Sequence, residues 1–179
     1  MGKSKKVTLI IGATIILIYA IFAIADTVSQ SSKTVDEAFE RYINSEFKTE
    51  VVQKEIGDKK FYRKGHSTFV IFEVSDKVSI VQFEKEVFGW KRTYYSDNRN
   101  EGDSYSTVVD GNGDILLHAV IPRNIVNEIK TIKVNGHDAD IIMLNDKTGI
   151  WLMMNENKDN FNNIKISFLD EVGNVIAEM

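Results

Sequence analysis

The stretch from Val7 to Ala25, VTLIIGATIILIYAIFAIA, constrains the whole chain because it contains neither a charged residue nor a proline. A helix of this length, at about 1.5 Å per residue, is close to the thickness of the hydrocarbon core of a bilayer. Three lysines lie within residues 1–6, and Asp26 follows the stretch directly. By the positive-inside rule, we expect residues 1–6 to be a cytoplasmic tail and residues 7–25 a single-pass transmembrane signal anchor in the cell membrane. The remaining chain would then be extracellular.

An alternative interpretation is that the same stretch belongs to a cleaved secretory signal peptide. Ala23-Ile24-Ala25 matches the small-residue pattern of a cleavage site, and cleavage there would release a secreted protein that begins at Asp26. The apolar core of a signal peptide is usually about 7–15 residues long, and this run is longer, which favours retention in the membrane. A lipid anchor is not expected, because the chain has no cysteine and Lys6 stands where a myristoylation signal has Ser or Thr.

The charge balance of the exported part excludes some classes of partner. Three of the 22 basic residues precede the anchor and all 26 acidic residues follow it, which leaves residues 26–179 with a net charge of −7. Nucleic acid is therefore not an expected partner, because its binding needs a concentrated basic face. The absence of cysteine excludes disulfides, a thiolate nucleophile and cysteine metal sites, so a hydrophobic core must hold the exported part together.

A helix is expected directly after a short polar linker at residues 26–33. The sequence Thr34-Val35-Asp36-Glu37 predicts a capping box, in which the Thr34 side chain accepts from the Glu37 amide and the Glu37 carboxylate accepts from the Thr34 amide. The apolar residues that follow recur with the helical period and predict one helix that ends near Phe47. These residues are Val35, Ala38, Phe39, Tyr42, Ile43 and Phe47.

The pattern then changes to one of strands and turns. We expect a turn at residues 57–59 and an antiparallel meander of four or five strands, so that residues 34–96 form one helix packed on a sheet. Residues 97–106 are polar and lack a period, which predicts a loop or a boundary. Residues 107–179 contain about six short strands separated by turns, including the type I′ signal Asn135-Gly136, and predict a small Ig-like β-sandwich. The expected fold class is α+β.

Several stretches resemble uncharacterised exported or membrane-anchored small proteins of low-GC Gram-positive, Bacillus-like bacteria. The matching residues are 87–91 (VFGWK), 132–139 (IKVNGHDA), Trp151 and 170–176 (DEVGNVI), and the resemblance covers most of residues 34–179. It implies an N-terminal anchor or lipoprotein signal, a helix with a meander, and a C-terminal β-sandwich. Many such proteins carry a lipobox cysteine, which this chain lacks, and the resemblance implies no catalytic residue.

One stretch could bind a metal ion. Asp110, Asn112 and Asp114 place oxygen-bearing side chains at alternate positions, as at the start of a calcium loop. A complete loop of that kind has glycine at its sixth position and glutamate at its twelfth, where this chain has Ile115 and Ile121. A glycine-rich turn that enters a strand explains the same residues. We therefore expect no metal and no other cofactor.

A second candidate site is an exposed aromatic face that binds a sugar or a peptide, formed by Trp90, Tyr94 and Tyr95 together with Phe88. A strand that covers a helix needs the same residues, so packing in the core is the competing interpretation. The three histidines, His66, His118 and His137, lack metal-ligand spacing. We expect His66 and His137 in turns and His118 within a strand. Trp90 and Trp151 are both expected to be structural.

These observations favour a non-enzymatic, membrane-tethered extracellular module that binds a protein or a cell-envelope component. One alternative is an enzyme of the cell envelope whose site leaves no local motif, since no nucleophile and base pairing stands out in the sequence. The other alternative is a regulatory anchor or sensor, in which the membrane helix pairs with a partner. The sequence names no reaction and no specific ligand.

Overall fold

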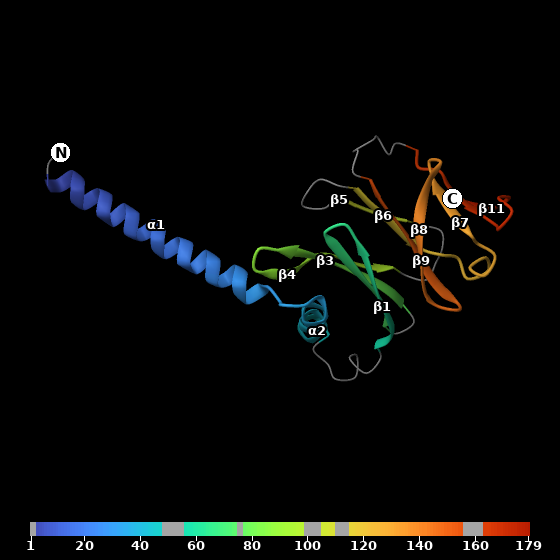
Figure 1. The fold of residues 1–179 in the computed structure, drawn as a ribbon, viewed down its shortest axis with the longest axis horizontal. Helices are drawn as coiled ribbons and strands as arrows, with labels where there is room; N and C mark the ends of the chain where they lie inside the picture. Colours follow the sequence, from blue (N-terminus) through green and yellow to red (C-terminus); the bar gives the residue numbers. More distant parts are fainter. Residues whose placement is uncertain (1–2, 48–55, 75–76, 99–104, 110–114, 156–162) are drawn as a thin grey trace.

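The computed structural model describes residues 3–47, 56–74, 77–98, 105–109, 115–155 and 163–179. Within these ranges the chain forms two helices followed by eleven strands, and every pair of neighbouring strands is antiparallel (Figure 1). The strands make a four-stranded sheet and a seven-stranded sheet. The predicted α+β class, with an apolar N-terminal helix and antiparallel sheets, is confirmed.

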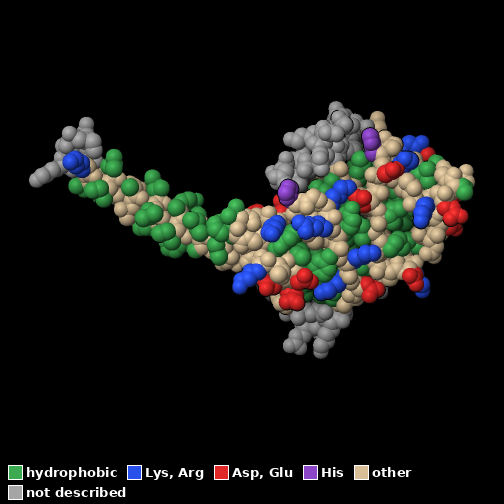
Figure 2. Space-filling model, viewed as in Figure 1, with side chains coloured by type: hydrophobic (Ala, Val, Ile, Leu, Met, Phe, Trp, Pro, Cys, Tyr) green, Lys and Arg blue, Asp and Glu red, His purple; other side chains and the backbone are tan. Residues whose placement is uncertain are grey.

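The first helix, α1 (Lys3–Gln30), contains the whole apolar stretch. Its large apolar side chains are exposed, and Figure 2 shows them along the length of a helix that projects away from the rest of the chain. Exposure of so much apolar surface to water is unfavourable, whereas a bilayer would accept it. The helix is long and apolar enough to cross a membrane, which suggests membrane association as an anchor or as a signal sequence.

Residues 26–33, which we expected to form a linker, are helical over 26–30. A side chain directly after α1 helps to satisfy the last carbonyl groups of this helix, since the Ser31 hydroxyl donates to the carbonyl of Thr27 at 2.9 Å. Ser32 is buried and forms an isolated β-bridge with Trp90. Backbone hydrogen bonds therefore join the apolar helix to the domain.

The second helix, α2 (Val35–Glu46), begins at the predicted N-cap. Thr34 Oγ1 accepts from the Glu37 amide at 3.1 Å, as the capping box requires. The Glu37 carboxylate accepts from the amide of Lys33 at 3.0 Å, so the predicted return bond to the Thr34 amide is displaced by one residue. The predicted apolar stripe is confirmed by the residues that the helix buries. These are Ala38, Phe39, Tyr42 and Ile43.

The four-stranded sheet is a meander in the order β1-β2-β3-β4, and α2 packs on it. Its strands are β1 (Ile56–Lys64), β2 (Ser67–Val74), β3 (Lys77–Glu86) and β4 (Gly89–Asn98). The predicted turn at residues 57–59 is wrong, because β1 continues through these residues with an irregular register between Ile56 and Lys59. A bulge admits an extra residue without ending a strand, so Gly57 and Asp58 belong to an irregular strand.

The seven-stranded sheet has the order β11-β10-β7-β8-β9-β6-β5. Its strands are β5 (Ser106–Val109), β6 (Ile115–Val120), β7 (Thr131–Val134), β8 (His137–Asn145), β9 (Thr148–Asn155), β10 (Ile166–Leu169) and β11 (Val175–Glu178). Residues 137–139 of β8 pair with β7, and residues 140–145 pair with β9. The sheet curls at β8, and its two halves face each other as in a sandwich.

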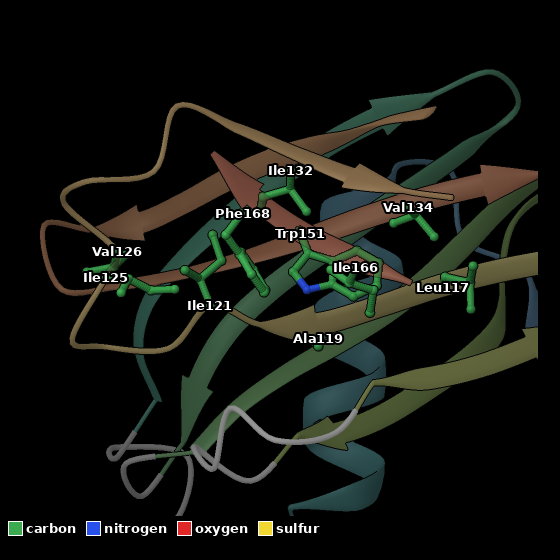
Figure 3. Packing of buried hydrophobic residues seen from close by; sticks show 10 residues of the cluster. All are labelled: Leu117, Ala119, Ile121, Ile125, Val126, Ile132, Val134, Trp151, Ile166 and Phe168. Atoms are coloured by element: carbon green, nitrogen blue, oxygen red, sulfur yellow. The ribbon is translucent and has the colours of Figure 1, made fainter. Parts of the chain in front are cut away.

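Three hydrophobic clusters fill the spaces between successive layers. The first lies inside the curled sheet, where Trp151 of β9 and Leu117 of β6 lie toward Phe168 of β10 and Ile132 of β7 (Figure 3). The second lies between α2 and the four-stranded sheet. The third lies between the two sheets and includes residues of both. The helix-and-meander part and the sandwich part therefore share a core.

The shared core explains why several strands are apolar at successive positions. In β2, Phe69 and Ile71 face the second sheet, whereas Val70 and Phe72 face α2. The strands β6 and β9 divide their side chains in the same way between the inter-sheet core and the interior of the curled sheet. Such strands are buried on both faces, so their sequences lack the alternation of a strand with one solvent face.

Polar contacts between β1 and β8 add to the apolar core between the sheets. The Lys60 ammonium donates to the carbonyl of Met143 at 3.0 Å, and Lys64 forms an ion pair with Asp140. Across the interface from β4, the Tyr94 hydroxyl lies 3.0 Å from Nε2 of His118 on β6. The two sheets are thus held in one relative register by apolar and polar contacts.

Candidate functional site

The predicted aromatic face is divided by a β-bulge in β4. The register of β4 against β3 shifts between Gln82 and Phe83, which leaves one extra residue on β4. Because of this shift, Trp90 and Tyr95 lie on the face that carries α2, although one position is even and the other is odd. Tyr94 lies on the opposite face and packs against the inter-sheet core.

The three aromatic candidates consequently have different surroundings. Trp90 is partly buried against the α2 cluster, and Tyr95 is 40% exposed with its ring 5.5 Å from that of Tyr42. Tyr94 bonds to His118 between the sheets, and burial raises the pKa of its phenol. Trp151 is fully buried, as expected for a structural tryptophan. Of the three aromatic candidates, Trp90 lines a pocket, which is described next.

A pocket of about 320 Å³ lies where α1 meets the domain. Three segments that are separate in the sequence form its wall: the end of α1 with the residues after it, one side of α2, and the β3–β4 hairpin. Its lining residues are Ser29, Gln30, Ser32, Ala38, Arg41, Tyr42, Ser45, Phe83, Trp90, Lys91 and Arg92. We call this space the junction pocket.

Among the described residues that line the junction pocket, three are cationic, Arg41, Lys91 and Arg92, and none is acidic. Arg41 donates to the carbonyl of Ser29 at 2.6 Å, and so caps the C-terminal end of α1 from the neighbouring helix. Arg92 pairs with Glu46 at 2.7 Å on the domain surface. A guanidinium has five N–H donors, so both arginines retain donors for a ligand. The pocket concentrates positive charge in a part of the chain whose net charge is −7.

One hydroxyl group in the pocket wall is buried without a hydrogen bond. Ser32 is at least nine-tenths buried, and Ser32 Oγ has no partner with hydrogen-bond geometry in the described part of the chain. Tyr42 is equally buried, and this burial, together with the charge of Tyr95 and a side-chain hydrogen bond with it, raises the pKa of Tyr42, so its phenol stays protonated. Both hydroxyl oxygens have almost no accessible surface, so these two residues shape the wall of the pocket and do not present their hydroxyls to its open space.

Gly89 allows the pocket to form. Its φ of +131° lies in a region that L-residues rarely adopt. A Cβ at this position would lie 2.3 Å from the carbonyl oxygen of Ser32. That carbonyl accepts from the Trp90 amide at 2.7 Å, and the Ser32 amide donates to the Trp90 carbonyl at 2.9 Å. The absence of a side chain therefore lets β4 begin directly against the end of α1.

The remaining candidates from the sequence do not join this pocket. Asp110, Asn112 and Asp114 lie outside the described residues, so the calcium-loop hypothesis stays a prediction. No cluster of three or more potential metal ligands occurs within the ranges that the structure describes. His66 lies in a turn, as predicted, whereas the prediction of a turn at His137 is wrong, because His137 is the first residue of β8 and pairs with Val134; both side chains are exposed. His118 lies within β6, as predicted, and its full burial between the sheets lowers its pKa to about 4. His118 is therefore a neutral core histidine near pH 7.

Sequence reasoning identified Trp90 but missed the other residues that give the pocket its chemistry. Arg41 lies on the side of α2 away from the predicted apolar stripe, and from the sequence Arg92 is expected to be a strand residue that faces solvent. Only the packing of α1, α2 and β4 against one another brings them together. No local motif could have revealed this set.

Comparisons with protein-family models, with curated proteins and with solved structures find no match to this chain. The resemblance to exported proteins of Bacillus-like bacteria therefore stays a prediction.

Proposed function

We propose that this chain is a membrane-tethered extracellular module that binds an anionic group of a cell-envelope component in the junction pocket. The observation that carries this proposal is the lining of the pocket, where three cationic side chains, Arg41, Lys91 and Arg92, lie together. Guanidinium and ammonium groups bind phosphate and carboxylate oxygens through charge-assisted hydrogen bonds.

The position of the pocket supports a ligand at the membrane surface. Seven residue steps separate Ala25, the end of the apolar run, from Ser32 in the pocket wall. Five helical steps and two extended ones span at most about 15 Å. The polar headgroup layer of a bilayer extends roughly 5–7 Å on each side of the hydrocarbon core. The pocket would therefore lie just above the headgroups, within reach of anionic envelope material anchored there.

The extracellular orientation rests on the distribution of lysines. Three lysines precede the apolar run, and an acidic residue follows it, which favours export of the domain. In cells, we expect the chain to fractionate with membranes and protease added to protoplasts to remove the domain. Recovery of a mature protein from the medium, beginning at Asp26, would replace the tether with a cleaved signal sequence.

The test of the ligand class uses the full chain in nanodiscs of zwitterionic lipid. Trp90 lines the pocket and Trp151 lies in a separate core, so a ligand in the pocket should change mainly the Trp90 contribution to fluorescence. Glycerol phosphate and glucuronate serve as small phosphate and carboxylate probes. We expect a saturable change with at least one probe, lost at high ionic strength because exposed charges are screened.

Two variants and one matched control decide whether the response comes from the pocket. Lys91→Gln and Arg92→Gln should each weaken the fluorescence response roughly tenfold or more, because each removes a charged donor worth about 1.5–3 kcal/mol. Lys147→Gln removes an exposed charge from the β8–β9 turn and should leave the response unchanged. Absence of a saturable response to both probes, or an equal response in all variants, would refute an anionic ligand in the junction pocket.

A further inference from the structure

The tip of the β3–β4 hairpin carries two exposed apolar side chains. Val87 is 93% exposed and Phe88 is 47% exposed. Val87 is the most exposed large hydrophobic residue in the described part of the chain, and it exceeds even those of α1. Scattered exposed hydrophobic residues are normal on soluble proteins, so exposure alone assigns no role. The position of this hairpin relative to α1 is what distinguishes it.

The hairpin is bonded to the end of the apolar helix. Two backbone hydrogen bonds join Ser32, two residues beyond α1, to Trp90, two residues beyond Phe88. Figure 1 shows the tip of the β3–β4 hairpin pointing back toward the end of α1. The tip therefore extends from the Ser32–Trp90 bridge in the direction of the membrane that α1 would cross.

The dimensions place the tip at the lipid headgroups. The Ser32–Trp90 bridge lies at most about 15 Å above the end of the apolar run, as derived for the pocket. One strand step from Trp90 to Gly89 and the two-residue turn of Val87 and Phe88 separate the bridge from the tip, a distance of roughly 7 Å. With the tip directed toward the end of α1, as in Figure 1, its backbone would lie at most about 8 Å from the hydrocarbon core, close to the headgroup layer. Apolar side chains at that level extend toward the acyl chains.

The residues around the tip suit a membrane interface. Lys85 is exposed beside it, and its long side chain can place an ammonium group among lipid phosphates while its methylene groups lie on apolar surface. Trp90 has the amphipathic ring that is enriched at both interfaces of membrane proteins. Exposed Glu86 opposes this arrangement electrostatically, but the segment from Lys85 to Lys91 still has a net charge of +1.

We infer that Val87 and Phe88 insert into the outer interface of the same bilayer that α1 spans. This second contact would fix the orientation of the domain and hold the mouth of the junction pocket at the headgroup layer. The inference rests on the proposed membrane tether, but it is independent of which anion, if any, occupies the pocket.

The test exploits the absence of cysteine from the natural sequence. Single variants Val87→Cys, Phe22→Cys and Val172→Cys of the full chain are labelled with an environment-sensitive fluorophore in nanodiscs of zwitterionic lipid. Phe22 lies in the apolar run, and Val172 is exposed in the turn before β11. Quenching is measured with a lipid that carries a nitroxide near its headgroup and with aqueous iodide.

We expect the label at position 87 to show a blue-shifted emission, quenching by the nitroxide lipid and loss of iodide quenching. The label at position 172 should show the reverse. If the label at position 22 is protected from iodide while the label at position 87 is as accessible as that at position 172, the hairpin contact with lipid is refuted, and α1 is still a membrane tether. If position 22 is also accessible to iodide, the tether itself fails, and this inference fails with it.

If the tip contacts lipid, a polar substitution at Val87 should change the accessibility of the hairpin in nanodiscs and not the stability of the domain in detergent. Val87→Ser should leave the thermal stability in detergent unchanged, because the side chain is exposed in the folded domain. In nanodiscs, the same substitution should restore iodide quenching of a label at Phe88→Cys. Equal iodide quenching of that label with and without the Val87→Ser substitution would show that the tip does not hold the hairpin in lipid.

Discussion

Acidification from pH 7 to pH 4 should destabilise the folded chain through His118. The ring is fully buried between the two sheets, and its Nε2 lies 3.0 Å from the Tyr94 hydroxyl. Burial lowers the pKa of His118 from 6.5 to about 4, because a charged imidazolium would lose its hydration in this core. In the unfolded chain the same ring is hydrated and keeps its ordinary pKa.

The sign and the size of the effect follow from these two pKa values. Above pH 6.5 the ring is neutral in both states and contributes no pH dependence. Between pH 6.5 and pH 4 the unfolded chain binds a proton that the folded chain excludes, so the free energy of unfolding falls as the pH falls. A difference of 2.5 pKa units corresponds to roughly 3 kcal/mol, which is a large part of the stability of an ordinary domain.

The assay is urea unfolding of the full chain in zwitterionic micelles at pH 7, 6, 5 and 4, followed by tryptophan fluorescence. The informative variant is His118→Leu combined with Tyr94→Phe, which removes both partners and avoids leaving a buried hydroxyl unpaired. Carboxylates titrate in both proteins and cancel in the comparison. We expect the parent to lose roughly 3 kcal/mol more than the double variant between pH 7 and pH 4. His66→Gln and His137→Gln, at exposed positions, should follow the parent.

Nuclear magnetic resonance gives a direct check with labelled histidine. The signal of His118 should stay that of a neutral ring down to about pH 5. A His118 midpoint near 6.5 in the folded protein would refute the reasoning, as would an equal pH dependence in the parent and in the double variant.

Two further pairs of substitutions test how the packing depends on single residues. Gly89→Ala should lower the melting temperature more than Gly65→Ala. Both glycines have positive φ, but of the two only a Cβ at Gly89 meets backbone, at 2.3 Å from the carbonyl oxygen of Ser32. Equal shifts in melting temperature would show that Gly89 has no special role. Trp151→Ala should cost about 3–5 kcal/mol in urea unfolding, since the ring is fully buried inside the curled sheet. Trp90→Ala should cost less, because that ring is only partly buried, and a larger loss at Trp90 would contradict this order.

Local sequence patterns were sufficient for most of the secondary structure. The capping residue Thr34 and the stripe of apolar residues after it predicted α2. Alternating apolar and polar residues, or a high proportion of β-branched residues, predicted most strands. The failures were also local. The glycine and aspartate at positions 57 and 58 usually mark a turn, but the strand accommodates them as an irregularity. The short strand β5 (Ser106–Val109) was missed because its first residue was assigned to the polar loop 97–106.

The candidate site was predictable only in part. Trp90 was singled out from the sequence, but the face of the sheet on which its side chain lies was not predictable. A bulge in β4 places Trp90 and Tyr95 on one face and turns Tyr94 to the other, and no residue type marks that bulge. Arg41 and Arg92 drew no attention, because a charged residue on a helix or a strand ordinarily faces solvent.

The apolar span, the start of α2 and the positions of most strands are predictable from local sequence, because each depends on the backbone preferences and polarity of residues near one another in the chain. The shared core of the two sheets and the bonding of the end of α1 to β4 follow from tertiary packing. Those contacts join residues far apart in sequence, and their energies depend on which faces meet. The junction pocket is a product of these contacts, since residues 29–32, 38–45 and 83–92 form its wall only after packing.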